Sequence, residues 1–381
     1  MKLRIFAENL WVDGKWEKDS LIIISNGEVE KIIAGKTKDY DYSAVYVAPG
    51  VIDNHIHGGD GFDITCPSIE GMESWLNSLA ENGVCGVMPT PYGSIDEIRL
   101  SLKVIKEVAL LQKSGKVKGA KILGAHLEGP FLSTLRPGAM QPKDIVAPSV
   151  EAYKKIADGY EEIIKEISLA PENDGAEELT EFLADRGIKV LAGHTDCGYD
   201  KARDSFNNGV GAICHTFNAC RPIEHHMEPG VVAAALTDDR IFCEMISDLV
   251  HLHPGIIKLM YHCKGKKKIM IISDAVPTTN MPDGIYSELD PPIYVKDGVS
   301  RTLADNLIDG GGCYTSYSAR RVVKSGVPFE DVIYMTSVNP ASWLGIEKNE
   351  IAVGEKAFIS AWDNEMTPLF SVINHKVYKR K

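Results

Sequence analysis

Short apolar runs rich in β-branched residues alternate with amphipathic segments of helical length along most of the chain. From about residue 45 onward there are eight such runs, at residues 45–57, 85–90, 122–128, 167–171, 188–195, 211–217, 242–248 and 269–274. Between most of them lie segments with helical spacing of apolar residues, such as residues 68–82, 94–113, 151–165 and 200–208. Strands that alternate with helices predict βα units and a parallel sheet. Eight strands fit a closed (β/α)₈ barrel of the TIM type better than an open, doubly wound sheet.

The two ends of the chain have a different pattern. Residues 1–45 and 350–381 contain short strand-like pieces, such as residues 21–24, 29–33 and 358–361. We expect both termini to build one small β-sandwich domain, with a barrel domain of residues 46–349 inserted between them. No glycine-rich phosphate-binding motif follows any predicted strand, so a nucleotide-binding fold finds no support.

Composition and charge exclude several classes of partner. Hydrophobic residues make up 44% and charged residues 25% of the 381 residues, as in an ordinary globular protein. With 41 Lys and Arg against 53 Asp and Glu, the formal net charge of −12 argues against binding to nucleic acid or to a membrane surface. We find no signal peptide and no apolar run of about 18 residues that could span a bilayer. The eight cysteines form no C-x-x-C pair, which favours reduced thiols and a cytoplasmic location.

Metal-binding side chains follow five of the eight predicted strands. A barrel gathers its active site at the C-terminal ends of its strands, so these side chains are expected to meet there. In the first strand the two histidines are two residues apart and therefore point to the same face. A single histidine or carboxylate after a strand is usually an ordinary polar residue or a helix cap, but the joint pattern predicts a metal site. Its ligands would be His55, His57, Glu128, His194, His215 and Asp274.

Imidazole and carboxylate ligands without thiolate suit Zn²⁺ or Fe²⁺, with Mn²⁺ or Co²⁺ as alternatives. The ligand number permits one ion or two, and Glu128 could bridge two ions about 3.5–4 Å apart. A bound ion lowers the pKa of its water toward about 7. Amide hydrolysis also requires that the leaving amine be protonated, and Asp274 is the candidate that carries the proton. These residues predict a metal-dependent hydrolase that cuts a C–N amide bond.

A Ser or Cys nucleophile is less well supported. The chain has no G-x-S-x-G motif. Cys214 directly precedes His215 in a predicted strand, so its side chain is expected to face away from that histidine. His126 shares the face of Glu128, and both a substrate contact and a structural role remain open for it.

Six motifs occur in the order and spacing of the amidohydrolase superfamily: PGVIDNHIHG, HLEGPF, AGHT, HTFNA, EPGVVAAAL and SDAV. More narrowly, they resemble the N-acetylglucosamine-6-phosphate deacetylase family, through most of the chain. The resemblance implies removal of an acetyl group from an N-acetylated aminosugar or its phosphate, and a homodimer in which a loop reaches the partner's site.

The resemblance also implies roles for individual residues. Glu128, His194 and His215 match the metal ligands shared across the family, and Asp274 matches the catalytic aspartate. The pair of His55 and His57 matches the extra ligands of members that hold two metals. Substrate contacts are implied at His126, Ala139, Met140, Asn218, Ala219, Met227, His251 and Leu303.

Two departures from the family pattern concern the substrate. Met140 stands where the family usually has a histidine that donates a hydrogen bond to the substrate's amide carbonyl, and methionine cannot donate. Met227 stands where the family has an arginine that binds phosphate; Arg221 in the same loop could compensate. The segment of Leu303 also differs from the family's Leu-Ala-Gly. Two alternatives therefore stay open: an amidohydrolase acting on a non-phosphorylated N-acyl compound or cyclic amide, and a non-enzymatic protein with this fold.

Overall fold

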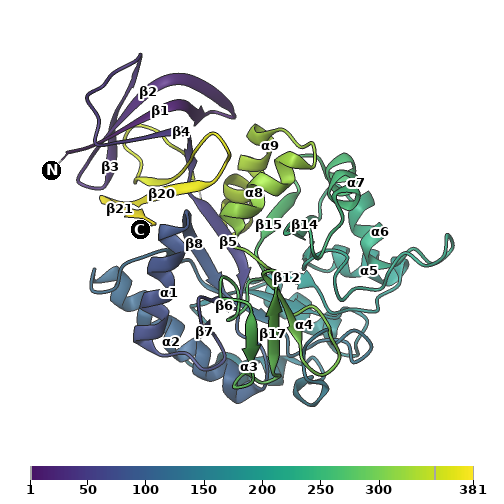
Figure 1. The fold of residues 1–381 in the computed structure, drawn as a ribbon. Coiled ribbons are helices and arrows are strands. Elements are labelled where there is room, and N and C mark those ends of the chain that lie inside the picture. Colours follow the sequence, from purple (N-terminus) through teal and green to yellow (C-terminus); the bar gives the residue numbers. More distant parts are fainter. Residues whose placement is uncertain (1, 347–348, 381) are drawn as a thin grey trace.

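Eight parallel strands close into a barrel in the computed structural model, which describes residues 2–346 and 349–380 (Figure 1). The strands are β5 (Val51–Ile56), β8 (Val84–Pro89), β10 (Ala125–Glu128), β11 (Ile164–Leu169), β12 (Lys189–Ala192), β13 (Val210–Ile213), β14 (Phe242–Ile246) and β15 (Ile269–Ile272). Strands β10 to β15 form one sheet in sequence order, while β5, β8 and the short β9 (Lys121–Ile122) form another. Backbone hydrogen bonds join the two sheets, from Asp274 N to His55 O (2.9 Å) and from Glu128 N to Pro91 O (3.0 Å). The predicted fold class is confirmed.

One helix follows each barrel strand and covers the outside of the ring. These helices are α1 (Ile69–Glu81), α2 (Ile95–Lys113), α3 (Val150–Ala157), α4 (Ala176–Ala184), α5 (Tyr199–Asn207), α6 (Gly230–Thr237), α7 (Pro254–Lys264) and α8 (Thr315–Lys324). Helix α2 shows how the sequence sets a boundary. Ser94 caps the backbone N–H of Glu97, and the Glu97 carboxylate accepts from Ser94 N at 2.8 Å, which forms a capping box. After α8, the short helices α9 (Phe329–Ile333) and α10 (Asn339–Trp343) flank a π-helical turn, Tyr334–Val338.

Two predicted boundaries differ from the structure. The predicted helix 151–165 ends at Ala157, and β11 already begins at Ile164. Gly159 lies between them with φ of 82°, a left-handed conformation that stops a helix. The predicted strand 45–57 is two strands, β4 (Tyr42–Pro49) and β5, with only Gly50 between them. A Cβ at Gly50 would collide with the ring of Phe358 and with Cys85, so this junction requires glycine.

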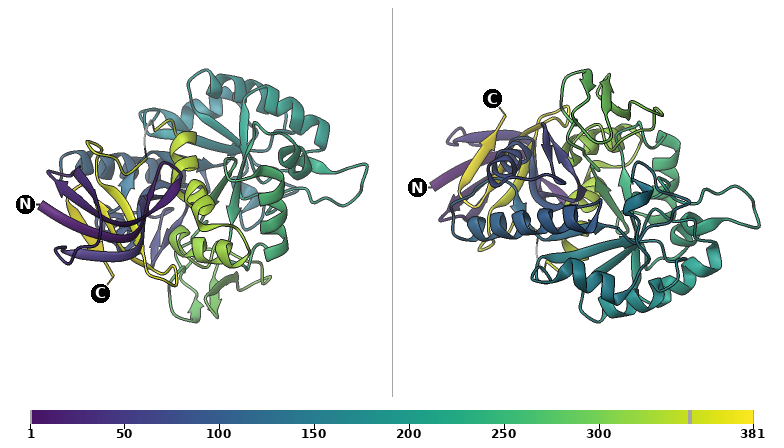
Figure 2. Two further views of the ribbon diagram at one scale, coloured as in Figure 1. Left: turned by 90° about the horizontal axis from the view of Figure 1, so that it is seen from above. Right: turned by 90° about the horizontal axis from the view of Figure 1, so that it is seen from below.

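Strands from both termini pair in one seven-stranded sheet at the side of the barrel (Figure 2). Its order is β21-β20-β19-β4-β1-β2-β3, with β1 (Lys2–Val12), β2 (Lys15–Ser25), β3 (Glu28–Ala34), β19 (Phe358–Trp362), β20 (Pro368–Ile373) and β21 (Lys376–Lys379). Its own apolar core draws on both ends of the chain, with Ile5 and Ile22 beside Ile359 and Val372. Both termini therefore build one unit, as expected; the division into residues 1–45 with 350–381 and residues 46–349 stays a prediction.

An insertion between β15 and α8 was not predicted. It holds a three-stranded antiparallel sheet of β16 (Gly284–Tyr286), β17 (Ile293–Lys296) and β18 (Val299–Thr302), beside the barrel in Figure 1. Two small strands, β6 (Gly58–Gly59) and β7 (Phe62–Asp63), and a 3₁₀ turn at Pro142–Asp144 complete the structure. None of the helices in residues 2–346 and 349–380 combines the length and apolar character of a membrane span.

Candidate active site and metal centre

Three of the predicted site residues share an unusual backbone conformation. His194, His215 and Asp274 each stand two positions after the last residue of β12, β13 and β15, with φ of 46°, 25° and 51°. Residues other than glycine seldom adopt positive φ, and such strain is concentrated at functional sites. The left-handed turn interrupts the alternation of the strand, so these side chains lie at the C-terminal mouth of the barrel.

The carboxylate of Glu128 is the centre of the cluster. Its Oε1 lies 3.3 Å from His55 Nε2, 3.2 Å from His194 Nε2 and 2.9 Å from His215 Nε2. Its Oε2 lies 3.3 Å from His57 Nε2. All five side chains are buried. Burial opposes ionisation of Glu128, but the charge of His55 and the hydrogen bonds from the other imidazoles outweigh it and hold the pKa of Glu128 well below its ordinary range.

Asp274 completes the group of six. Its Oδ1 lies 3.2 Å from His57 Nε2 and 3.4 Å from His55 Nε2. Burial opposes ionisation, but the hydrogen bond from His57 and the charge of His55 lower the pKa of Asp274 below its ordinary value. The same contacts act on the partner ring: burial disfavours charge on His57, yet its bonds to Asp274 and Glu128 raise its pKa to about 9. The two carboxylates thus make this spot strongly favourable for positive charge.

The imidazoles are oriented with their Nε2 atoms toward this spot. Three of them donate from Nδ1 to backbone carbonyls: His57 to Thr90 O (2.8 Å), His194 to Arg136 O (3.0 Å) and His215 to Asn218 O (3.0 Å). A carbonyl can only accept, so a neutral ring then carries its proton on Nδ1 and a lone pair on Nε2. His194 Nε2 and His215 Nε2 lie 3.2 Å apart, so two facing lone pairs need a proton or a metal ion between or beside them.

The donor set fits divalent metal ions. Nitrogen and oxygen donors suit Zn²⁺ or Fe²⁺. The donor atoms of His55, His57 and Asp274 all lie within 4.8 Å of one another, and so do those of Glu128, Cys214 and His215. The second group is joined to His194 through the Glu128 oxygen that both share. Nδ1–H bonds to backbone carbonyls are also the usual support of histidine ligands. The number and grouping of these donor atoms permit one ion or two.

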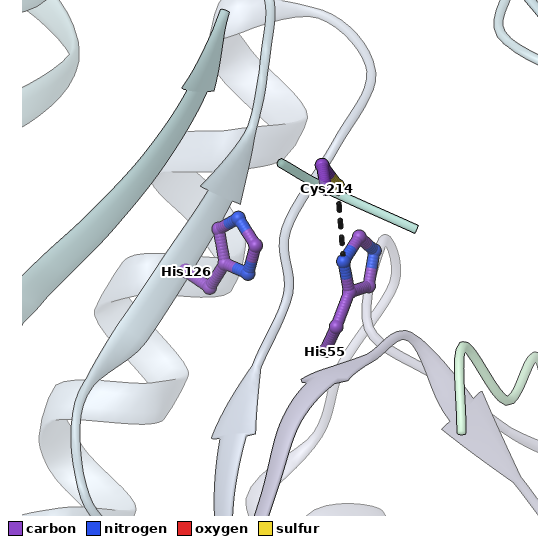
Figure 3. A group of neighbouring side chains, drawn as sticks. All are labelled: His55, His126 and Cys214. Carbon is purple, nitrogen blue, oxygen red and sulfur yellow. Dashed lines mark hydrogen bonds between the residues drawn. The ribbon is translucent and has the colours of Figure 1, made fainter. Parts of the chain in front are cut away.

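Cys214 differs from its predicted orientation. Figure 3 shows its thiol inside the barrel, where Sγ lies 3.4 Å from His55 Nδ1, and not facing away from the site. Strand β13 ends at Ile213, so the alternation on which the prediction rested does not reach Cys214. Its burial raises the pKa of the thiol well above the ordinary value, which keeps it protonated.

A layer of buried polar side chains lies beneath the cluster. Glu244 Oε2 lies 3.3 Å from His55 Nδ1 and accepts a hydrogen bond from His215 N at 3.3 Å. His126 is fully buried, with Nδ1 3.1 Å from Asn54 O and Nε2 2.8 Å from Ser168 Oγ. Burial, together with the charge of His55, lowers the pKa of His126 to about 4. Of the two roles left open for His126, the structure favours the structural one.

A cavity of about 410 Å³ opens above the cluster, and most of the predicted site residues line it. Its volume lies within the range of about 300–1,000 Å³ that is typical of small-molecule sites. The predicted residues in its wall are His57, Glu128, Ala139, Met140, His194, His215, Asn218, Ala219, His251 and Asp274. Asp248 orients His251 by accepting a hydrogen bond from its Nδ1 at 2.9 Å. Burial alone would lower the pKa of His251, but the bond to Asp248 outweighs burial and raises this pKa.

Besides the buried His126, two predicted substrate contacts do not line the cavity. Leu303 is 49% exposed on the insertion and does not line the cavity, whereas Leu307 and Ile308 of the same loop do. The substrate contact at Leu303 stays a prediction. Met227 is 72% exposed in the loop between β13 and α6, which extends beyond the barrel (Figure 2). It reaches no part of the cavity in its own chain.

The cavity also has residues that sequence reasoning missed. Tyr92 follows β8, and Arg301 and Asp309 belong to the insertion between β15 and α8. Burial raises the pKa of Asp309 to about 6, with a further contribution from the charge of Asp274. The one available signal was length: the stretch between β15 and α8 is far longer than an ordinary βα loop, and long loops in compact domains are usually functional.

Comparison with known proteins agrees with this arrangement. Residues 46–379 match the amidohydrolase family. The N-acetylglucosamine-6-phosphate deacetylase of Bacillus subtilis (strain 168) is 32% identical over 355 residues, which cover 89% of this chain and 88% of that protein. The N-acetylgalactosamine-6-phosphate deacetylase of Escherichia coli O157:H7 is 29% identical, over 94% of each chain.

Solved structures give the same assignment. A mutant N-acetyl-D-glucosamine-6-phosphate deacetylase from Mycobacterium smegmatis, in complex with N-acetyl-D-glucosamine-6-phosphate, superposes with a TM-score of 0.90 over 100% of both chains at 26% identity. The Thermotoga maritima enzyme has a TM-score of 0.86 at 26% identity, also over 100% of both chains. The chain therefore belongs to the amidohydrolase family and, within it, to the N-acetylglucosamine-6-phosphate deacetylases.

Proposed function

We propose that this protein is a metal-dependent deacetylase that removes the acetyl group from an N-acetylated amino-sugar phosphate. The observation that carries the proposal is the convergence of four imidazoles and two carboxylates from five barrel strands; five of these side chains line one cavity, while His55 lies buried behind them. A scaffold protein would have no reason to retain this set, because buried charges without a function cost stability.

The proposed metal ligands fall into two halves that share Glu128. His194 and His215 contact Oε1, whereas His57 contacts Oε2 and Asp274. His55 lies between the two halves, 3.3 Å from Oε1 and 3.4 Å from Asp274 Oδ1. Zn²⁺ or Fe²⁺ are the ions that this donor set favours. When bound, an ion in such a site supplies a Lewis acid for the amide carbonyl and makes water acidic enough to react at neutral pH.

Asp274 is the proposed proton carrier. Its lowered pKa keeps it ionised at neutral pH, so it can accept the proton of the attacking water. As the C–N bond breaks, the same carboxyl group returns that proton to the departing nitrogen, which leaves as a free amine, and the carboxylate is regenerated. The acetyl carbon keeps the oxygen of the water and leaves as acetate.

The other end of the substrate is assigned to the residues across the cavity. Asn218, Ala219 and His251 line it, and these positions correspond to the sugar-phosphate contacts of the family. The relative from Mycobacterium smegmatis was solved with N-acetyl-D-glucosamine-6-phosphate, which supports a substrate of this class here.

A second candidate is an amidohydrolase that acts on a non-phosphorylated N-acyl compound. Met140 in the cavity wall favours it, because a methionine cannot donate a hydrogen bond to an amide carbonyl. Met227 favours this candidate as well, because its side chain is exposed and carries no positive charge that could bind a phosphate group.

Acetate release by the purified chain tests the proposal. We expect kcat/KM to be much higher for N-acetylglucosamine 6-phosphate than for N-acetylglucosamine, and activity to vanish on chelation and return on refilling with Zn²⁺ or Fe²⁺. N-acetylgalactosamine 6-phosphate would be compared in the same assay. Equal rates on both forms of the sugar would favour the second candidate, and activity that survives complete removal of metal would exclude both.

We also propose that two chains pair and that the enzyme works in the cytoplasm. The loop between β13 and α6, which carries Met227, extends far enough from the barrel to meet a second copy. All eight cysteines are free thiols in the described part of the chain, which suits a reducing compartment. Light scattering of the eluted protein would give the mass, and a monomer at micromolar concentration would exclude the pair.

A further inference from the structure

Arg301 is a cation in the wall of the active-site cavity. Among the described residues that line the cavity, it is the only arginine, and no lysine joins it. It lies in β18, where the neighbouring side chains of Ser300 and Thr302 are buried in the insertion. Side chains alternate along a strand, so Arg301 points the other way.

The guanidinium group of Arg301 is held but not neutralised. Its Nη1 donates to the backbone carbonyl of Asn306 at 3.0 Å, which fixes the side chain along the loop. Within residues 2–346 and 349–380, no carboxylate forms an ion pair with it. Asp309 shares the cavity, yet its strongest charge interactions are with Asp274 and His57, at the metal end. Arg301 therefore has donors left for a ligand.

We infer that Arg301 binds the phosphate group of the substrate and so replaces the cation that is missing at Met227. The inference rests on the proposed function and adds a residue that sets its specificity. Guanidinium groups match phosphate oxygens with two parallel N–H donors, which makes arginine suited to this task. Arg221 does not line the cavity in its own chain; its guanidinium group lies beside Gly198, at the start of α5.

Three variants, assayed with the phosphorylated and the non-phosphorylated sugar, test the role of Arg301. Arg301→Met removes the charge while keeping an unbranched side chain, Arg301→Lys keeps the charge without the fork, and Lys296→Met removes an exposed cation of the same insertion as a matched control. We expect Arg301→Met to lower kcat/KM for N-acetylglucosamine 6-phosphate about 10- to 100-fold, chiefly through KM, as expected for the loss of charge-assisted hydrogen bonds. The value for N-acetylglucosamine should stay within about two-fold, Arg301→Lys should be intermediate, and Lys296→Met should equal the wild type.

Binding of inorganic phosphate gives a readout that does not depend on turnover. Calorimetry should show a Kd for phosphate that is at least about 10-fold weaker in Arg301→Met than in the wild type and in Lys296→Met. An unchanged phosphate Kd, or an unchanged preference for the phosphorylated sugar, overturns the role of Arg301. If the wild type hydrolyses neither sugar, the proposed function fails, while the phosphate titration still decides whether Arg301 binds this anion.

Discussion

His55 Nε2 and His57 Nε2 lie 3.1 Å apart, although the two side chains leave the same strand two residues from each other. Glu128 and Asp274 each lie within 3.4 Å of both nitrogens. Two imidazoles and two carboxylates at such distances are stable only when positive charge joins them, as protons or as a metal ion.

Metal content should separate the two halves of the site. We expect the refilled wild type to hold up to two ions per chain, His57→Ala and His194→Ala to hold one fewer, and Glu128→Ala to hold none. Activity of Glu128→Ala should fall by at least about 10³-fold, because several kcal/mol of charge stabilisation are lost. Elemental analysis measures the ions, and His262→Ala, in an exposed part of α7, serves as the control. Full metal content in Glu128→Ala would refute the shared carboxylate.

Removal of the proposed proton carrier should affect turnover more than binding. Asp274→Asn is expected to lower kcat by about 10²- to 10⁴-fold with a small change in KM, since loss of general acid–base catalysis has this magnitude. Asp297→Asn, at the turn between β17 and β18, should behave as the wild type. A kcat for Asp274→Asn within a few-fold of wild type would leave the proton transfer to another group.

The layer beneath the cluster offers a matched pair of substitutions. Glu244 supports His55, and its pKa is lowered because its bonds with His55 outweigh its burial. Glu244→Gln should therefore weaken metal binding about 10- to 100-fold, as is usual when a ligand histidine loses its support. Burial, with the charge of Glu244, raises the pKa of Glu166 well above its ordinary value and so favours its neutral form, which a glutamine resembles; Glu166→Gln should therefore change little. Chelator competition measures both affinities, and equal weakening would contradict the distinction.

Stability of the metal-free protein should fall with acidity through His126. Its pKa is about 4 in the folded chain, against an ordinary value of 6.5, so between these values the unfolded chain binds more protons. The stability that neutral His126 contributes is complete above pH 6.5 and is lost as the pH falls to 4, by about 3 kcal/mol. Urea unfolding at both pH values should show a smaller acid-induced loss in His126→Asn, whereas His262→Asn should follow the wild type. Parallel losses in all three proteins would show that His126 does not titrate in this window.

The sequence predicted those parts of the site that depend on strand periodicity and on the order of elements. The alternation of His55 and His57 and the strand ends at Glu128, His194 and His215 required only the rule that barrel strands end at one face. The orientation of Cys214 was predicted wrongly because His215 adopts φ of 25°. A histidine at this position gives no sign in the sequence that its φ is positive. The insertion that supplies Arg301 and Asp309 contains a hairpin of two alternating strands, but this alternation does not tell where the hairpin lies relative to the cavity, which only the structure shows.

The junction at Gly50 makes the strand of His55 and His57 a direct continuation of the terminal sheet. Val51 N at the start of β5 donates to the Ser360 hydroxyl of β19 at 3.0 Å, which ties this strand to the far end of the chain a second time. Within the described residues, no side-chain hydrogen bond joins the strands of the other ligands to the terminal sheet in this way. Damage to the C-terminal strands would consequently disturb the strand that carries His55 and His57 before it reaches the strands of the other ligands.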